Sequence, residues 1–401
     1  MGASAAQILA ERDWDVLVVG AGPAGLTTAR ALADAHVSVL VLEEHESVGD
    51  PVHCTGVLGL DAFDEIDLPR DTICTVTRTA NFHGRAGRSL VVDGGQIAAA
   101  VVDRGRFDRA LADRAAVAGA VIARGVRAQQ IAITSRGVTT TVQCGAAPDR
   151  RVRSRVCVLA CGAQYRFNRQ LGLGIPRAYL QTAQIETPFA PVDAIDIDLD
   201  RALAPRGFAW LVPFRRGDAH MARVGLMAAD AAAARFRQYV ELLTRRHGAP
   251  AIRARPRLKV LPLGPVRKTY ADRVLAIGDA AGLAKPTTGG GIYYGVLSGQ
   301  IAAEVLADAL THDRTTAATL RRYETQWQVR LGPELRAGLA FRTLAARFDD
   351  RAIDALLELA AVDGIIPLLR RTANFNWHRQ AALALLRNPG FRRIVLSSLW
   401  S

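Results

Sequence analysis

The sequence predicts an α/β protein: a domain with a parallel sheet, an inserted sheet that is mostly antiparallel, and a helical region toward the C-terminus. Three observations support this fold class. Apolar runs at 15–20 and 38–42 flank a segment with helical spacing, which is typical of a β-α-β unit with a buried parallel sheet. Amphipathic strand patterns predominate over 176–265. Beyond residue 316, nearly every segment has helical periodicity.

The elements of the first part follow in chain order. The run "DVLVVG" at 15–20 is a strand, "PAGLTTARALADAHV" at 23–37 is a helix, and "SVLVLEE" at 38–44 is the next strand. A helix is expected over 103–120. Strand-like segments then continue to "RVCVLACGA" at 155–163.

The second half contains a helical pattern near 230–247 and a buried strand in "RVLAIGDAAG" at 273–282. A glycine cluster then opens a long helix that runs to about residue 310. We therefore expect three units: a discontinuous first domain at 1–175 and 265–312, an inserted β-sheet domain at 176–264, and a C-terminal helical region at 313–401.

The composition restricts the compartment and the chemistry. Five cysteines, an odd number with no C-x-x-C pair, indicate neither a disulfide framework nor a zinc site, so no metal is expected. No stretch reads as a signal peptide, and no apolar run approaches the roughly 18 residues that span a bilayer. We expect a cytoplasmic protein.

The formal net charge of +13 indicates an anionic partner. No nucleic-acid-binding module is recognisable, so nucleic acid is not the expected partner. Residues 364–401 contain six arginines and no acid, interleaved with Phe375, Trp377, Phe391 and Trp400. Such a segment suits peripheral binding to an anionic membrane surface. The alternative is a helical cap with buried aromatics and solvated arginines. The oligomeric state stays open.

A dinucleotide-binding motif stands at the first strand-to-helix junction. Gly20, Gly22 and Gly25 form G-x-G-x-x-G, in which the first glycine permits a tight turn, the second lets a pyrophosphate approach, and the third lets the helix pack on the sheet. The phosphates would lie at the helix N-terminus, where free N–H groups favour negative charge. Glu43 ends the second strand, where a carboxylate can accept hydrogen bonds from ribose hydroxyls. The context predicts a Rossmann-like domain.

The segment "AIGDAAGLAKPTTGGGI" indicates a flavin rather than a nicotinamide nucleotide. Asp279 follows a strand and can bond a ribityl chain. Gly289, Gly290 and Gly291 begin a helix, and their N–H groups can stabilise negative charge on a reduced flavin ring. We also expect the three glycines to permit close approach of the planar ring.

Together, "GAGPAG", Glu43, "VDRGRFDRAL", "LACGA" and "GDAAG…PTTGGG" resemble FAD enzymes with the hydroxybenzoate-hydroxylase fold. Within that group, "GDPVHCTG" and "GFAWLVP" are similar to the proline-and-cysteine box and the aromatic signature of the geranylgeranyl reductase family. The similarity runs from about residue 14 to 310. Phe208 stands where tyrosine is usual, Val212 where phenylalanine is usual, and "LACGA" has a cysteine where an acid often precedes the glycine.

The resemblance implies FAD as cofactor and an isoprenoid chain on a lipid, quinone or diphosphate as substrate, whose C=C bonds are reduced. The implied cofactor-binding residues are Gly20, Gly22, Pro23, Ala24, Gly25, Glu43, Glu44, Cys54, Arg104, Ala128, Gly162, Gly278, Asp279, Pro286, Gly289, Gly290, Gly291 and Ile292. Phe208, Trp210 and Pro213 are the implied substrate-lining residues; an ordinary sheet core is the alternative for them.

Cys54 is the candidate catalytic residue. The resemblance implies that its loop runs over the cofactor toward the flavin ring, with Gly49, Pro51 and Gly56 shaping the turn. A steric or substrate-lining role for the thiol stays open. The adjacent His53 is expected to be inert, as histidines on solvated loops usually are.

Two other functions remain from the sequence, and a third is nearly excluded by a missing lysine. An FAD monooxygenase shares the fold, and a flavin-dependent halogenase shares a motif like "FAWLVP", although the lysine such enzymes need before that motif is missing. A flavoprotein that binds FAD without catalysis would keep the same glycines. The electron donor is not encoded by a second dinucleotide motif, so we expect transient NAD(P)H binding or a small redox protein.

Overall fold

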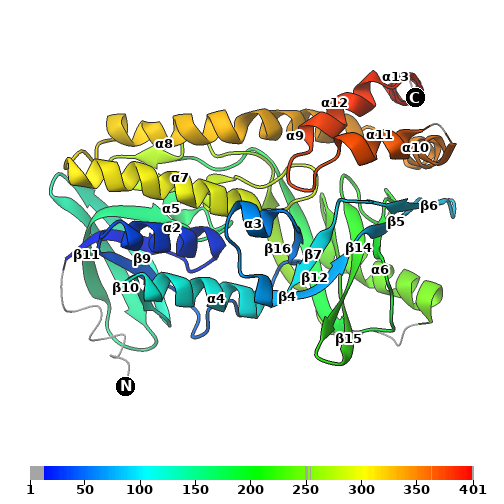
Figure 1. Cartoon of the computed structure of the whole chain (residues 1–401). Coiled ribbons are helices and arrows are strands. Elements are labelled where there is room, and N and C mark those ends of the chain that lie inside the picture. The colour runs from blue at the N-terminus through cyan, green and yellow to red at the C-terminus, as the bar shows by residue number, and fades with distance from the viewer. Residues whose placement is uncertain (1–12, 249–251, 253, 363, 400–401) are drawn as a thin grey trace.

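The computed structural model describes residues 13–248, 252, 254–362 and 364–399. In this part of the chain the strands form three sheets, and the helices are concentrated on the first sheet and at the C-terminal end (Figure 1). The α/β fold class, with its second, mostly antiparallel sheet and helical C-terminal region, is confirmed.

The first sheet is built on the predicted β-α-β unit. Its strands lie in the order β17 (Tyr270–Ala271), β18 (Val274–Ala276), β11 (Arg150–Leu159), β1 (Trp14–Val19), β2 (Val39–Leu42) and β8 (Val121–Ala123), and β11 also pairs with a hairpin of β10 (Gly137–Cys144) and β9 (Val126–Thr134). β1 pairs in parallel with β2 and β11, and Leu17 lies opposite Leu40 and Cys157. All three side chains are fully buried, as expected for strands covered on both faces.

Helices on this domain pack against one another in the order α4 (Arg104–Val117), α2 (Pro23–Asp34), α7 (Ile292–Thr311) and α8 (Ala317–Arg330). Small residues let α2 and α7 approach closely: a Cβ on Gly299 would lie 2.7 Å from the carbonyl oxygen of Ala24. Thr28 Oγ1 donates to the carbonyl of Gly299 across the same contact, at 3.1 Å. This contact holds α2 against the first half of α7.

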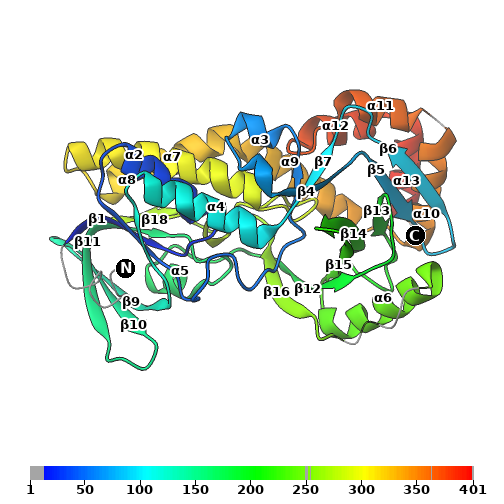
Figure 2. The same cartoon turned by 60° about the horizontal axis from the view of Figure 1, so that its bottom comes forward.

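The second sheet has the strand order β16 (Arg257–Pro262), β12 (Tyr179–Pro188), β15 (Ala219–Ala228), β14 (Phe208–Arg216), β13 (Ile195–Asp198), β5 (Thr79–His83) and β6 (Ser89–Asp93). Its pairs are antiparallel apart from β13 and β5, in which Ile195 lies opposite Ala80. Helix α6 (Ala232–His247) packs on one face (Figure 2). The sheet thus includes residues 79–93, which lie outside the predicted 176–264 segment. The sequence around β5 and β6 has no local pattern that predicts pairing with a strand so distant in the chain.

A smaller sheet of β3 (Val57–Gly59), β7 (Ala99–Val102) and β4 (Ile73–Thr77) follows the Cys54 loop. Four short helical segments complete the two domains: α3 (Ala62–Glu65), η1 (Arg70–Thr72), α5 (Arg166–Gln170) and η2 (Gly278–Ala281).

The C-terminal region continues through α9 (Gly332–Ala345), α10 (Asp350–Val362), α11 (Ile365–Thr372), α12 (Arg379–Arg387) and α13 (Pro389–Leu399), and lies over the second sheet (Figure 1). Within the described ranges, no helix has the length and apolar character needed to cross a bilayer. The aromatic residues expected in the C-terminal segment differ in their surroundings. Phe391 is buried, Trp377 packs against Tyr293 and Tyr294, and Trp400 lies outside the described residues.

Candidate functional site

A cavity of about 1030 Å³ extends from the C-terminal ends of β1 and β2 to one face of the second sheet. Its volume is at the upper end of the roughly 300–1,000 Å³ typical of ligand sites. Most of the expected site residues line it: Gly20, Gly22, Pro23, Ala24, Glu43, Glu44, Cys54, Arg104, Ala128, Gly162, Gly278, Asp279, Gly289, Gly290, Gly291, Ile292, Phe208 and Trp210. Gly25, Pro286 and Pro213 are not among its lining residues.

The three glycines of the first turn differ in what surrounds them. A Cβ on Gly20 would lie 2.5 Å from the carbonyl oxygen of Ala160, and a Cβ on Gly25 would lie 2.2 Å from the carbonyl oxygen of Gly20. A Cβ on Gly22 would meet no described atom within 4 Å. Protein packing therefore requires the first and third glycines. The second borders the cavity at the N-terminus of α2, where free backbone N–H groups favour a bound anion.

Glu43 closes the same end of the cavity. Its Oε2 accepts a hydrogen bond from the backbone N–H of Ala21 at 3.0 Å, and its Oε1 accepts one from the backbone N–H of His45 at 3.0 Å. These bonds orient the carboxylate beside the glycine turn. Nδ1 of His45 also lies 2.6 Å from Oε1, so Oε2 is the oxygen that keeps capacity for a hydroxyl donor.

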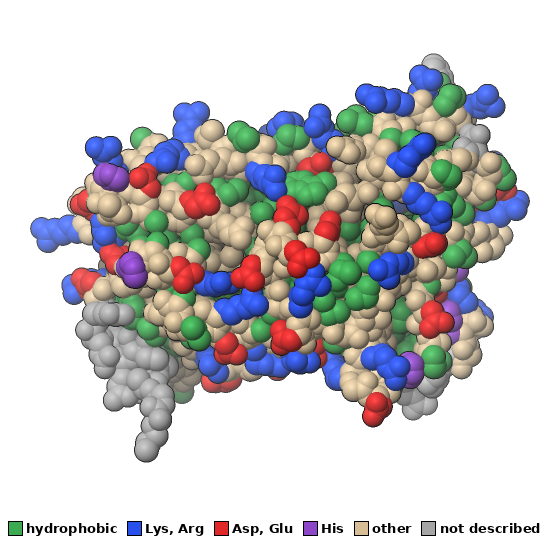
Figure 3. Space-filling view, viewed as in Figure 1, with side chains coloured by type: hydrophobic (Ala, Val, Ile, Leu, Met, Phe, Trp, Pro, Cys, Tyr) green, Lys and Arg blue, Asp and Glu red, His purple; other side chains and the backbone are tan. Residues whose placement is uncertain are grey.

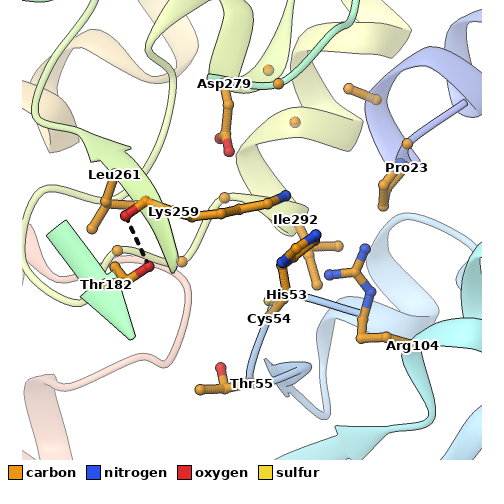
Figure 4. Close-up of a pocket in the computed structure, with 18 of the residues that line it drawn as sticks. Pro23, His53, Cys54, Thr55, Arg104, Thr182, Lys259, Leu261, Asp279 and Ile292 are labelled. Carbon is orange, nitrogen blue, oxygen red and sulfur yellow. Dashed lines mark hydrogen bonds between the residues drawn. The ribbon is translucent and has the colours of Figure 1, made fainter. Parts of the chain in front are cut away.

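Asp279 points into the middle of the cavity (Figure 4). Burial raises the pKa of its carboxyl group, although Lys259 and Arg104 oppose the shift. Its carboxylate also leaves no room for a side chain at position 291, because a Cβ on Gly291 would lie 2.6 Å from Oδ1 of Asp279.

Neighbouring side chains also leave no room for a Cβ at the other two glycines of the cluster. A Cβ on Gly289 would lie 2.6 Å from Leu261 Cδ2, and one on Gly290 would lie 2.9 Å from Lys285 Cε. The sequence suggested that a ring requires these glycines. The structure shows that side chains of the protein itself already crowd each position.

The Cys54 loop crosses the cavity opposite Asp279 (Figure 4). Gly49 and Gly56 have φ values of +80° and +62°, which favour glycine. Cys54 lies near Arg104 (Figure 4), and the guanidinium of Arg104 forms a bidentate pair with Asp108, with Nη2 of Arg104 2.8 Å from Oδ2. Burial opposes the charge of Arg104, but the Asp108 carboxylate outweighs it and raises the pKa of the guanidinium.

Comparison of the chain with known proteins shows the family to which it belongs. A family model described as lycopene cyclase protein matches residues 15–357. Digeranylgeranylglycerophospholipid reductase 2 of Methanopyrus kandleri is 29% identical, over 89% of this chain and 93% of the relative. The reductase of the same name from Methanothermobacter thermautotrophicus is 30% identical, over 86% of this chain and 91% of the relative. The chain belongs to the geranylgeranyl reductase family of FAD-dependent oxidoreductases.

A solved structure agrees with this assignment at the level of the fold. A geranylgeranyl bacteriochlorophyll reductase-like protein from Thermoplasma acidophilum matches this member of the geranylgeranyl reductase family with a TM-score of 0.81. The two are 22% identical, and the match covers 96% of this chain and 98% of the other.

The apolar end of the cavity in this geranylgeranyl reductase family member is formed by β14 and its neighbours. Phe208, Trp210 and Val212 alternate along β14 and line the cavity. Pro213 does not, so its expected substrate-lining place is corrected. Residue 213 has the opposite parity from 208, 210 and 212, so it faces the other side of the pleated strand. The alternation visible in the sequence could have identified Val212 instead.

Lys259 was missed by the sequence analysis. It lies on the edge strand β16 and extends into the cavity toward His53 and Ile292 (Figure 4). Its side chain is exposed to the cavity, yet the surrounding protein desolvates the ammonium, and this burial lowers its pKa. Solvated lysines are common on edge strands, where they prevent pairing with another chain. The sequence pattern of β16 does not distinguish Lys259 from such a lysine.

His53 is half-buried rather than on a solvated loop. Burial, and then the positive charge of Lys259, lower the pKa of its imidazole to about 4. The ring is therefore neutral at pH 7. It does not carry the proton that an imidazolium would donate.

Lys285 also lines the cavity and was not singled out from the sequence. Its Nζ donates to the carbonyl of Phe375 at 2.9 Å, and its backbone N–H donates to the carbonyl of Gly290 at 3.0 Å. Burial lowers the pKa of the ammonium to about 7. Through Lys285, the loop between α11 and α12 contacts the glycine cluster.

Proposed function

We propose that this chain reduces C=C bonds of an isoprenoid chain, geranylgeranyl or polyprenyl, carried by a lipid, quinone or diphosphate. The observation that carries the proposal is the continuity of the cavity. One end is lined by a dinucleotide-binding turn, and the other by apolar and aromatic side chains, with Cys54 between them. The relatives whose names specify digeranylgeranylglycerophospholipid reduction support the choice of substrate class.

The residues present fit FAD. The open space at Gly22, the N-terminus of α2 and the carboxylate of Glu43 suit the pyrophosphate and the adenosine ribose. Asp279 suits the ribityl chain, because it is a partly buried carboxylate that faces the cavity. Glu44, Ala128, Arg104, Gly162, Gly278 and Ile292 complete the proposed contacts, while Gly25 and Pro286 contribute by packing. FAD supplies a hydride when it is bound and reduced.

The apolar end of the cavity orients the substrate and excludes water. Phe208, Trp210 and Val212 face it from β14, and Ile195 and Ile197 face it from β13. Side chains of this kind have no polar group that competes for an alkene, and they hold the reacting carbons in place.

Saturation of a C=C bond requires a proton as well as a hydride. We propose Cys54 as the catalytic residue, because it lines the cavity next to Thr55, whose carbonyl is bonded to the second sheet, and its thiol can hold a proton. The neutral state of His53 leaves that residue without a proton to donate as an imidazolium. Electrons are proposed to come from NAD(P)H or a small redox protein.

We also propose that α12 and α13 bind an anionic membrane surface. Leu383 and Leu386 are each 40% exposed on α12, between the exposed ends Arg379 and Arg387. On α13, Leu396 is 58% exposed, close to the exposed pair Arg392 and Arg393. Figure 3 shows Lys and Arg side chains gathered over this end of the molecule.

The position of the cavity supports this use of the C-terminal helices. Phe341 of α9 and Phe375, before α12, line the cavity. Phe341 also packs in the apolar cluster that contains Phe391 of α13. A prenyl chain drawn from the bilayer at α12 and α13 would thus have a short apolar route to the site.

The decisive experiment is anaerobic. The flavin is photoreduced in the purified protein, and polyprenyl phospholipids, diphosphates and quinones are added in turn. The proposal expects flavin reoxidation together with a product heavier by two hydrogen atoms per reduced bond. Reoxidation by oxygen alone, accompanied by hydroxylation of an aromatic substrate, would instead identify a monooxygenase.

A further inference from the structure

We propose that Arg223 is a positioning residue, which together with Glu186 holds the Cys54 loop against the second sheet. The inference deepens the proposed function. It rests on that function only for the part that Cys54 takes in the reaction.

Arg223 lies on β15 and is fully buried. Its Nη1 donates to the carbonyl of Thr55 at 2.5 Å, and its Nε donates to Oε1 of Glu186 at 2.8 Å. The guanidinium also stacks on Phe214, with Cζ 4.5 Å from the ring centroid. A rigid planar group is thus fixed on three sides and presents one N–H to the loop.

The loop is shaped to receive this group. Gly56 has a φ of +62°, and a Cβ there would lie 2.6 Å from Nη1 of Arg223. The backbone N–H of Gly56 donates to Sγ of Cys54 at 3.4 Å. Arg223 therefore holds the peptide between Thr55 and Gly56 whose N–H contacts the thiol.

Glu186 links Arg223 and the Cys54 loop to the start of α4. Its Oε2 accepts from Nη2 of Arg216 at 2.7 Å, and Nε of Arg216 lies 3.6 Å from Oδ2 of Asp103. Asp103 caps α4 by accepting from the backbone N–H of Arg106 at 3.0 Å. Because α4 begins with Arg104, Glu186 supports both the loop that carries Cys54 and the helix whose arginine lies beside the thiol.

Stability alone does not account for a guanidinium at this place. Nη2 of Arg223 is buried and has no hydrogen-bond partner among the described residues, so the residue carries the cost of an unsatisfied charged donor. Apolar residues often replace buried ion pairs at no loss of stability. The contact that an apolar residue could not provide is the hydrogen bond to Thr55, which fixes the Cys54 loop.

The test compares Arg223→Lys, Arg223→Met and Glu186→Gln in the FAD-loaded protein. Arg215→Met is the matched control, because Arg215 is an exposed arginine on the adjacent strand. Alkylation by iodoacetamide is followed at each cysteine by peptide mass spectrometry, and Cys144 on β10 serves as the internal reference. Substrate kinetics are measured on the same preparations.

Release of the loop should raise the alkylation rate of Cys54 relative to Cys144 by about tenfold, and should lower kcat about tenfold with KM nearly unchanged. Arg215→Met should change neither quantity. A wild-type ratio of the two alkylation rates in Arg223→Lys and Glu186→Gln would overturn the proposal. Glu186→Gln decides the matter if the Arg223 variants do not fold. Since alkylation needs no prenyl substrate, absence of reductase activity in the wild type would count against the proposed function and leave this test intact.

Discussion

A carboxylate oxygen of Asp279 occupies the space that a side chain on Gly291 would need, since a Cβ there would lie 2.6 Å from Oδ1. The two residues come from neighbouring turns that meet at the start of α7.

Gly291→Ala should therefore displace the Asp279 carboxylate and weaken FAD binding. A hydrogen bond to a charged group contributes about 1.5–3 kcal/mol, so we expect a loss of roughly 10- to 100-fold in affinity, close to that of Asp279→Ala. Fluorescence titration with FAD measures it. Gly332→Ala is the control, because Gly332 does not line the cavity and a Cβ there would approach only the flexible side chain of Arg336, at 3.1 Å. Equal FAD affinities of Gly291→Ala and Gly332→Ala would remove Asp279 from the proposed site.

Gly22→Val should yield a folded protein without FAD. The added side chain has open space in the protein and blocks only the place where the pyrophosphate would lie. Gly20→Val, in contrast, should lower the stability itself by at least about 1–3 kcal/mol, because φ at Gly20 is +111° and its Cβ would clash with Ala160. Thermal unfolding of the FAD-free proteins separates the two effects. Full FAD occupancy in Gly22→Val would contradict the assignment of this turn.

Cys54→Ala should leave FAD bound and slow the reoxidation of reduced flavin by a prenyl substrate. We expect a loss of about 10²- to 10⁴-fold if the thiol supplies the proton. Stopped-flow absorbance under anaerobic conditions follows the step. Cys74→Ala is the control, since Cys74 lies on β4 and does not line the cavity. If both variants react at the wild-type rate, Cys54 lines the site without a chemical role.

Lys285 should make the free energy of unfolding increase between about pH 7 and pH 10.5. Its pKa falls from 10.5 to about 7 on folding because of burial, so the unfolded chain binds more protons between these values. Stability then rises with pH across that window, and the cost of the buried charge is complete below pH 7. Lys285→Met should lose this rise in urea unfolding measured at several pH values. Lys268→Met, outside the cavity, should retain it, and a retained rise in Lys285→Met would refute the assignment.

Membrane binding should depend on the arginines of α12 and α13. Each arginine near anionic lipid contributes about 1 kcal/mol, so replacing Arg379, Arg387, Arg392 and Arg393 together by Gln should abolish sedimentation with anionic vesicles. Binding should also fall with salt and be absent with neutral vesicles. Gln at Arg136 and Arg237, two exposed arginines elsewhere, is the control. Equal sedimentation of both variants would exclude this surface. Deleting the whole region would also remove Phe375 from the cavity, so point variants are the cleaner test.

Local spacing in the sequence was sufficient for much of the fold and for one end of the site. The β-α-β unit, the helices at α4, α6 and α7, and the C-terminal helices lie where their periodicity predicts. The glycine turn, Glu43 and Asp279 line one cavity, because each follows a strand of the same parallel sheet and such strand ends converge.

The other end of the site was decided by tertiary structure. Arg223 meets Thr55 across 168 residues of sequence, and Lys259 reaches the cavity from an edge strand. Strands β5 and β6 join a sheet whose other members begin about a hundred residues later. Periodicity reports which face of an element is buried, but it does not report which distant element covers that face. Local patterns were thus enough to predict the glycine turn and the order of the elements. Only packing decided which side chains surround Cys54, because that choice depends on contacts between segments whose spacing in the chain carries no pattern.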